Sequence, residues 1–195
     1  MLSKDAAAYD NATLSTIIRC HQRERLPLLE EAIFSLAIQY WHDIELVIVL
    51  QNGTDEIAQE VDHIIRLQPW TSTPLYRILS VHIPAGVDGR SSLLNRGIAE
   101  ATGRFLAFLD DDDVVYQNGY TTLIEQLRSS GHVIAIGGCR AARIQFIANH
   151  WFVKTKDIPF GWGRSRLDIF RQNFVPIHSY VIDEEPPWLF RALLR

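Results

Sequence analysis

The chain has 195 residues, of which 47% are hydrophobic and 22% are charged, a balance that supports one globular core and excludes a mainly disordered chain. Nineteen Lys and Arg against 23 Asp and Glu give a net charge of -4, so no overall basic excess favours nucleic acid or anionic lipid as a partner. The two cysteines, Cys20 and Cys139, have no metal-site or disulfide-framework spacing, and no segment is apolar enough for a secretory signal or a transmembrane span, so we expect a cytoplasmic protein.

Short apolar runs alternate with segments of helical spacing, which predicts βαβ units around a mainly parallel sheet. The expected strands in this part are 14–19, 45–50, 76–82 and 105–109, and the expected helices are 26–40, 55–67, 91–101 and 120–128. Pro27 falls in the first turn of its helix, where the missing N–H costs little. Gly103 is expected to cap the end of the third helix.

The second half of the chain has a weaker pattern. Residues 133–136 predict a fifth strand, and 141–147 predict a strand that turns back on the same sheet. From Asn149 onward aromatic residues alternate with glycines and basic residues, which favours irregular or mixed structure. No repeat or charged linker divides the sequence, so we predict a single domain over residues 1–195, with halves at about 12–130 and 131–195.

Four consecutive aspartates, Asp110 to Asp113, directly follow the expected strand 105–109. Adjacent carboxylates repel one another unless a cation lies among them, and ligands of open α/β sheets bind beyond the carboxyl ends of the strands. Alternate carboxylates of Asp-x-Asp can share one divalent ion, and oxygen ligands favour Mg²⁺ or Mn²⁺. A solvated acidic loop or an N-cap cluster is the alternative interpretation.

The sequence around the aspartates carries a longer pattern. GRSSLLNRGI (89–98) and ATGRFLAFLDDDD (101–113) resemble the G-x-S-x-A-R-N-x-G-I…A-x-G-x-[YF]-[IL]-x-F-L-D-x-D-D pattern of family 2 glycosyltransferases. STIIRCHQR (15–23) and ELVIVLQNGTD (45–55) are similar to that family's S-V-I-I-P-T-Y-N-R and E-I-I-V-V-D-N-G-S-T-D segments, the second with one residue missing. The resemblance covers residues 14–128. It implies a GT-A fold, a Rossmann-like and mainly parallel sheet flanked by helices.

The resemblance also implies residue roles at the aspartates. Asp110 and Asp112 match the D-x-D motif that holds the ribose and a Mn²⁺ or Mg²⁺ ion bridging the diphosphate of a nucleotide sugar. Asp111 lies between them in the same nucleotide-sugar site, and Asp113 matches a further acidic position beside the metal. Such an ion would stabilise the charge that develops on a diphosphate leaving group.

Further positions of the nucleotide-sugar site follow from the same resemblance. Cys20 and His21 match a pair that lines the base pocket, although a surface histidine is as good an interpretation of His21. Gln51 or Asn52 stands where an acidic residue usually accepts a hydrogen bond from the base. Asn95 matches the pattern's Asn, but the Arg before it is here Leu94, which leaves Arg90 or Arg96 for the diphosphate. The pattern's proline after the first strand is here Arg19, and nothing in the sequence explains this change.

Inverting transfer needs a general base that removes the proton of the acceptor hydroxyl. In the family a late acidic motif supplies this base, and the late acidic cluster here is Asp183-Glu184-Glu185. We therefore take Glu184 and Glu185 as candidate catalytic residues, with a solvated loop as the alternative. The acceptor-side part is expected to be abbreviated or truncated. His178 and Ser179 lie in a stretch that resembles the approach to a late strand near the acceptor, although a loop histidine beside a proline is more often structural.

These patterns favour an inverting, metal-dependent glycosyltransferase of cell-surface polysaccharide or glycan synthesis. The resemblance implies a nucleotide diphosphate sugar as donor, with a UDP-sugar favoured, and a glycan or lipid-linked hydroxyl as acceptor. The rival interpretation is a non-catalytic nucleotide-sugar-binding or scaffolding domain of the same fold. Aromatic residues such as Trp151 and Trp162 leave peripheral contact with a membrane open, although their default role is packing.

Overall fold

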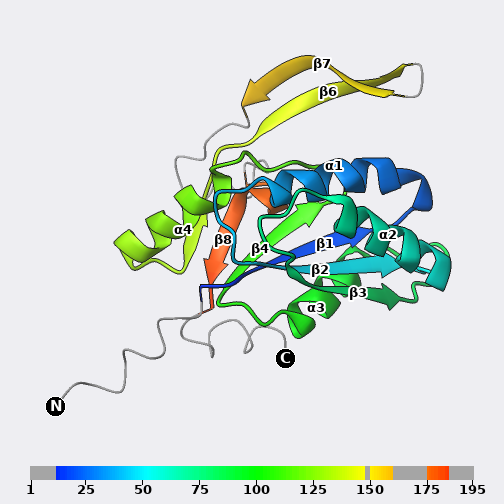
Figure 1. The fold of residues 1–195 in the computed structure, drawn as a ribbon, viewed down its shortest axis with the longest axis horizontal. Coiled ribbons are helices and arrows are strands. Elements are labelled where there is room, and N and C mark those ends of the chain that lie inside the picture. The colour runs from blue at the N-terminus through cyan, green and yellow to red at the C-terminus, as the bar shows by residue number, and fades with distance from the viewer. Residues whose placement is uncertain (1–11, 148–149, 160–174, 185–195) are drawn as a thin grey trace.

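The computed structural model describes residues 12–147, 150–159 and 175–184. Its main element is a six-stranded sheet with the order β3-β2-β1-β4-β8-β5 (Figure 1). The strands are β1 (Leu14–Cys20), β2 (Ile44–Gln51), β3 (Leu75–Val81), β4 (Phe105–Asp110), β5 (Ile134–Ile136) and β8 (Tyr180–Asp183). Strands β3, β2, β1 and β4 are parallel, and β8 runs antiparallel to both β4 and β5. This order confirms the predicted mainly parallel α/β sheet.

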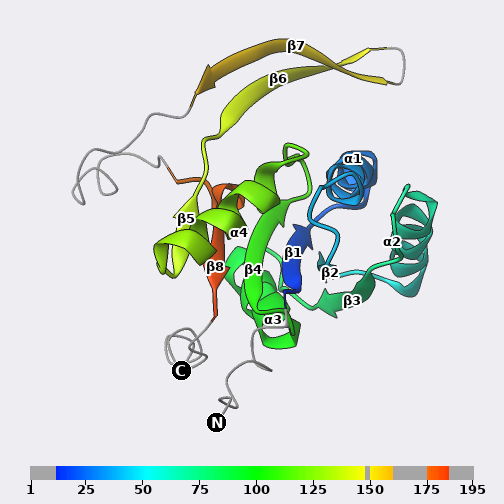
Figure 2. The same cartoon turned by 60° about the vertical axis from the view of Figure 1, so that its left-hand side comes forward.

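Helices cover both faces of the sheet, as Figures 1 and 2 show. Helices α1 (Leu26–Ala37), α2 (Asp55–Leu67) and α4 (Gly119–Ser130) pack on one face, and α3 (Arg90–Glu100) packs on the other. The central strand β2 is buried on both faces from Ile44 to Leu50, which explains the unbroken apolar run at 46–50. Two hydrophobic core clusters, one beneath α1, α2 and α4 and one beneath α3, therefore hold the helices against the sheet.

Local signals explain most of the helix boundaries. Pro27 lies in the first turn of α1. Thr54 caps α2, because its Oγ1 accepts a hydrogen bond from the N–H of Ile57. Gly131 ends α4 with a left-handed φ of 67°. The prediction that Gly103 caps α3 is wrong, because α3 ends at Glu100 and Ala101 is its C-cap. A Cβ on Gly103 would lie 2.5 Å from the carbonyl oxygen of Thr13, so close packing at the start of β1 requires glycine there.

The second half departs furthest from the sequence-based expectation. Strand β6 (Arg140–Ile147) pairs with β7 (His150–Pro159) in a separate antiparallel sheet, which projects from the main body (Figure 2). The prediction that 141–147 returns to the main sheet is wrong, because β8 takes the place beside β4. Of the irregular or mixed structure predicted from Asn149 onward, residues 150–159 form a regular strand. Within the part of the chain that the structure describes, no helix is both long and apolar enough to cross a membrane.

Candidate functional site

The four aspartates lie where the parallel strands β1 and β4 end, at the carboxyl edge of the sheet. Arg19 and Asp110 are paired in the register of the two strands. After Asp110 the chain turns, and the N–H of Asp113 donates to the carbonyl oxygen of Asp110 at 3.1 Å. The sequence predicted this placement, which is where ligands bind in open α/β sheets.

Arg19 holds both carboxylate oxygens of Asp110. Its Nε donates to Oδ1 at 2.5 Å and its Nη2 donates to Oδ2 at 2.8 Å, the bidentate geometry that suits a guanidinium and a carboxylate. Ile17 and Phe108, two residues earlier on each strand, lie in the core cluster beneath α3. Arg19 and Asp110 therefore face the α3 side of the sheet, because side chains two apart on a strand share a face.

A second arginine holds the next two aspartates. Arg25 precedes α1, and its Nε and Nη2 donate to Oδ1 of Asp111 at 2.9 and 2.6 Å, while Nη2 also lies 2.8 Å from Oδ2 of Asp112. These carboxylates raise the pKa of Arg25 above its usual value, Asp111 most strongly. Asp111 is only 1% exposed, and its Oδ2 has no hydrogen-bond partner among the described residues.

Asp113 meets a histidine from a distant part of the chain. His178 lies on a 3-10 turn, Ile177–Ser179, directly before β8, and its Nδ1 is 2.6 Å from Oδ2 of Asp113. Because β8 runs antiparallel to β4, this turn reaches the carboxyl end of β4. The sequence-based suggestion that His178 lies near the site is thus supported by its position.

The predicted base pocket is only partly assembled. Cys20 is 3% exposed, and its pKa is raised to about 12 by burial and by the nearby Asp111 carboxylate. Its side chain is therefore a neutral, buried group beneath the candidate base pocket. His21 is about half exposed, and its Nδ1 lies 3.9 Å from Oδ2 of Asp111. Gln51 ends β2 and is half-buried. Cys20, His21 and Gln51 thus all lie at the carboxyl edge, at or just beyond the ends of β1 and β2.

Asn52 has a structural role in the turn after β2. Its φ is 52°, a left-handed conformation that Asn tolerates better than most residues. Its Nδ2 donates to the carbonyl oxygen of Ile83 at 3.0 Å, and its Oδ1 accepts from the N–H of Ile83 at 2.8 Å. The amide therefore fastens the β2 turn to the loop after β3. Of the two candidates for base recognition, Gln51 is the one that these bonds leave available.

Helix α3 brings one of the predicted diphosphate contacts to this edge. Arg90 is its first residue, and it forms an exposed pair with Asp88, Nη2 to Oδ2 at 2.6 Å. Hydrogen bonds from Arg90 lower the pKa of Asp88 to about 2. Arg96 pairs with Glu100 one turn along the same helix. Asn95 is exposed in the middle of α3, and its side chain forms no hydrogen bond with the aspartates in the described part of the chain.

Glu184 lies at the opposite edge of the sheet. Its N–H donates to the carbonyl oxygen of Arg104 at 2.9 Å, and Arg104 directly precedes β4. The six residues of β4 span about 17 Å, so the structure does not bring Glu184 to Asp110. A general base must reach the reacting oxygen, and for this reason Glu184 is not a suitable candidate. Glu185 lies outside the described residues.

The carboxylates as they stand do not form a divalent metal site. Both oxygens of Asp110 are held by Arg19, and one oxygen each of Asp112 and Asp113 is held by Arg25 and His178. In the described ranges no group of three or more His, Cys, Asp or Glu side chains could hold a metal ion. The expected D-x-D carboxylates therefore lie together at the sheet edge, but arginine and histidine side chains are their partners.

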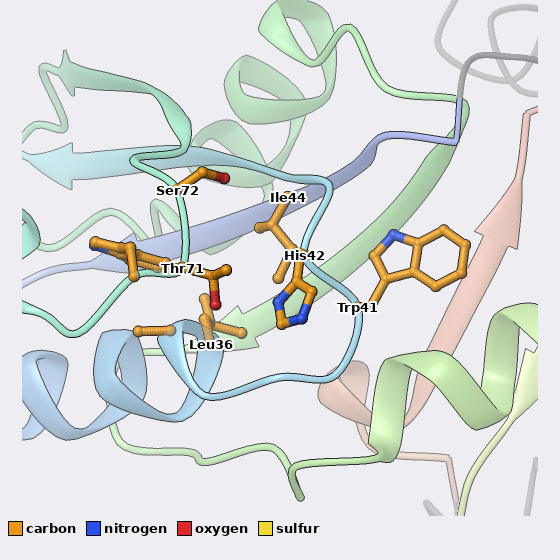
Figure 3. A pocket seen from close by; sticks show the side chains of 8 residues that line it. Leu36, Trp41, His42, Ile44, Thr71 and Ser72 are labelled. Carbon is orange, nitrogen blue, oxygen red and sulfur yellow. The ribbon is translucent and has the colours of Figure 1, made fainter.

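A depression elsewhere on the molecule does not compete as a site. It is shown in Figure 3, and the residues labelled there are Leu36, Trp41, His42, Ile44, Thr71 and Ser72. Ile44 begins β2, so this depression lies at the amino edge of the sheet, beyond reach of the aspartates. Of the charged residues at the carboxyl edge, Arg25 was missed by the sequence reasoning, because nothing in its local pattern reveals a partner 86 residues away.

The chain is similar to known proteins in both sequence and fold. The sequence model described as Glycosyl transferase family 2 matches residues 15–189. The GalNAc(5)-diNAcBac-PP-undecaprenol beta-1,3-glucosyltransferase of Campylobacter jejuni is 28% identical over 126 residues, which are 65% of this chain and 38% of that protein. The uncharacterized glycosyltransferase YibD of Escherichia coli is 33% identical over 90 residues, 46% of this chain and 24% of that protein. The chain thus spans less than two fifths of the length of these relatives.

Solved structures share the fold at low sequence identity. TarS 1-349 of S. aureus in complex with UDP has a TM-score of 0.51 at 20% identity, over 63% of this chain and 34% of that one. The mannosyltransferase PcManGT of Pyrobaculum calidifontis, in complex with GDP-Man and Mn²⁺, has a TM-score of 0.50 at 18% identity, over 62% of this chain and 34% of that one. The likeness to these neighbours supports the predicted GT-A fold.

Proposed function

The chain belongs to glycosyl transferase family 2, and from this premise we propose that it transfers a sugar, with inversion, from a nucleotide diphosphate sugar to a hydroxyl acceptor. The observation that carries the proposal is the group of four aspartates at the carboxyl end of β4, with Arg19, Arg25 and His178 as partners. Charged groups of both signs at this edge suit a ligand that carries a diphosphate and sugar hydroxyls.

We propose that the donor lies across the ends of β1, β2 and β4. In this arrangement His21 stacks on the base and Gln51 accepts a hydrogen bond from it, while Asp110 and Asp112 accept hydrogen bonds from ribose and sugar hydroxyls. The exposed fractions of the Asp110 and Asp112 side chains, 27% and 45%, leave both within reach of a ligand. Arg90 at the start of α3 is the proposed contact of the diphosphate on the other side.

The choice of donor and acceptor is supported by the relatives. TarS was solved with UDP and with UDP-GlcNAc, which supports a UDP-sugar as the first donor to test. The Campylobacter jejuni relative is named for a polyprenol-linked glycan, which supports a lipid-linked or glycan acceptor. A cell-surface glycan is therefore the proposed product, and the cytoplasm is the proposed location of the reaction.

Among the described residues we assign none to the general base or to a divalent metal, two parts of the expected mechanism. The described residues contain no carboxylate that is free and near the aspartates to act as general base, once Glu184 is placed at the far edge. PcManGT was solved with Mn²⁺, but the carboxylates of this chain are already engaged by its own side chains. We therefore propose no step that passes through a divalent ion.

Calorimetric titration with UDP-GlcNAc and GDP-Man tests the proposed function. We expect the parent chain to bind one of them, and Asp112→Asn to weaken that binding about tenfold through loss of charge-assisted hydrogen bonds. Asp183→Asn is the matched control, because Asp183 forms a bidentate arginine pair at the opposite edge. Absence of binding to these and other sugar nucleotides would refute the proposal. Binding without hydrolysis or transfer would instead favour a non-catalytic binding domain.

A further inference from the structure

The aspartate cluster already contains the positive charge that a divalent ion would bring. Arg19 and Arg25 are guanidinium groups that stay protonated at any working pH, so together they carry the charge of one divalent ion. They bind Asp110 on one side of the turn, and Asp111 and Asp112 on the other. The two side chains thus engage the D-x-D carboxylate oxygens that the expected metal would need as ligands.

Arg19 can contact a further anion while it remains paired. A guanidinium has five N–H donors, and Asp110 accepts two of those of Arg19. The side chain is 15% exposed, so part of it reaches the surface. It faces the same side of the sheet as α3, and the Arg90–Asp88 pair at the start of that helix is close enough for Arg19 to act on Asp88 electrostatically. A diphosphate placed between Arg19 and Arg90 would meet two guanidinium groups.

An independent observation indicates that a ligand completes this cluster. The side chain of Asp111 is almost wholly buried, yet its Oδ2 accepts no hydrogen bond from any described residue. Burying a carboxylate oxygen without a donor is costly, and Nδ1 of His21 in the candidate base pocket lies 3.9 Å from it, too far for a hydrogen bond. A hydroxyl or N–H donor of a bound nucleoside would satisfy this oxygen.

Resting on the proposed function, we infer that Arg19 and Arg25 replace the divalent ion, so that the chain binds a nucleoside diphosphate without any metal and Arg19 contacts the diphosphate. Where the family pattern has a proline, this chain has a cation beside the first aspartate. The replacement explains why the four aspartates lie together although no three carboxylates of the described residues form a group that could hold a metal ion. Arg25 serves mainly to hold Asp111 and Asp112, and Arg19 is the residue that touches the ligand.

The test is nucleotide binding in the presence of EDTA and in the presence of Mn²⁺. UDP, GDP and dTDP are titrated calorimetrically into the parent chain under both conditions. We expect one of the three nucleotides to bind. Its dissociation constant in EDTA and its dissociation constant in millimolar Mn²⁺ should agree within about threefold. Manganese titrated alone and followed by electron paramagnetic resonance is expected to stay free, because arginine side chains occupy its ligands. This part of the experiment needs no variant.

Variants then assign the effect to Arg19. Arg19→Gln is expected to weaken nucleotide binding in EDTA about tenfold or more, the usual weight of charge-assisted hydrogen bonds. Arg104→Gln is the matched control, since Arg104 forms the same bidentate pair with Asp183 at the opposite edge of the sheet. The exposed fractions of the two arginine side chains are similar, 14% for Arg104 and 15% for Arg19. Arg104→Gln should leave binding unchanged, and circular dichroism checks that both variants remain folded.

The possible outcomes separate the inference from the proposed function. Binding of UDP, GDP or dTDP that requires Mn²⁺ in the parent chain would overturn the inference and leave the proposed function intact. Equal loss of binding in Arg19→Gln and Arg104→Gln would overturn the direct role of Arg19. Absence of binding to all three nucleotides under both conditions would overturn the proposed function itself.

Discussion

Replacement of Arg25 by Gln should destabilise the fold strongly, because it strands a buried carboxylate. Arg25 makes two hydrogen bonds to Asp111, at 2.9 and 2.6 Å, and the Asp111 side chain is only 2% exposed. Removing one partner of a buried ion pair costs about 3 to 5 kcal/mol. In a chain of this length each kcal/mol lowers the melting temperature by roughly 2 to 4 °C, so we expect a decrease of about 6 to 20 °C in calorimetry.

Two further variants show whether the buried charge is the cause. Arg66→Gln breaks an exposed pair with Asp62 on α2, and it should cost less than about 1 kcal/mol. The double variant Arg25→Gln/Asp111→Asn removes the stranded charge, and it should recover more than half of the loss. If Arg25→Gln costs no more than Arg66→Gln, or if the double variant is worse than the single one, the reasoning about Asp111 is wrong.

Three other predictions follow from the contacts that support the site. Glu45 accepts four hydrogen bonds, from Ser15, Thr102 and Arg77, and these bonds lower its pKa although burial opposes ionisation. In urea titrations Glu45→Gln should therefore lower the free energy of unfolding by about 2 kcal/mol near pH 7. The loss should shrink as the pH falls below about 4, where the parent carboxylate becomes protonated. In Gly97→Ala the new Cβ would lie 2.4 Å from Cγ2 of Ile17, and calorimetry should show a loss of about 1 to 3 kcal/mol as α3 moves off β1. Because burial and Asp111 raise the pKa of Cys20 to about 12, iodoacetamide at pH 8 should leave native Cys20 unmodified and label it after unfolding. Peptide mapping separates Cys20 from the half-buried Cys139, and rapid labelling of Cys20 in the folded chain would show that this end of β1 is open.

The parallel half of the fold could be read from the sequence because its signals are local. Unbroken apolar runs such as 46–50 predict buried parallel strands, and the helix predicted over 55–67 has the bounds of α2 in the structure. The hairpin of β6 and β7 could not be read, because its register contains two shifts that blur the alternation of side chains. The direction of β8 could not be predicted either, because nothing near Glu184 in the sequence shows that this strand runs antiparallel to β4 and places Glu184 far from the aspartates.

The same distinction applies to the candidate site. The four aspartates could be placed at a strand end from sequence alone, since the preceding apolar strand fixes where they emerge. Their partners could not, because Arg19 lies 91 residues from Asp110 and Arg25 lies 86 residues from Asp111. The structural role of Asn52 depends on a positive φ and on two bonds to Ile83, neither of which a sequence pattern records.

The most direct test of the proposed donor site is a crystal structure of this chain grown with UDP-GlcNAc or with the sugar nucleotide that binds best. We expect the diphosphate over the carboxyl ends of β1 and β4, with a phosphate oxygen about 3 Å from the guanidinium of Arg19 and sugar or ribose hydroxyls on Asp110 or Asp112. A nucleotide bound elsewhere, with no contact to residues 110–113, would contradict the assignment of this edge as the glycosyltransferase site.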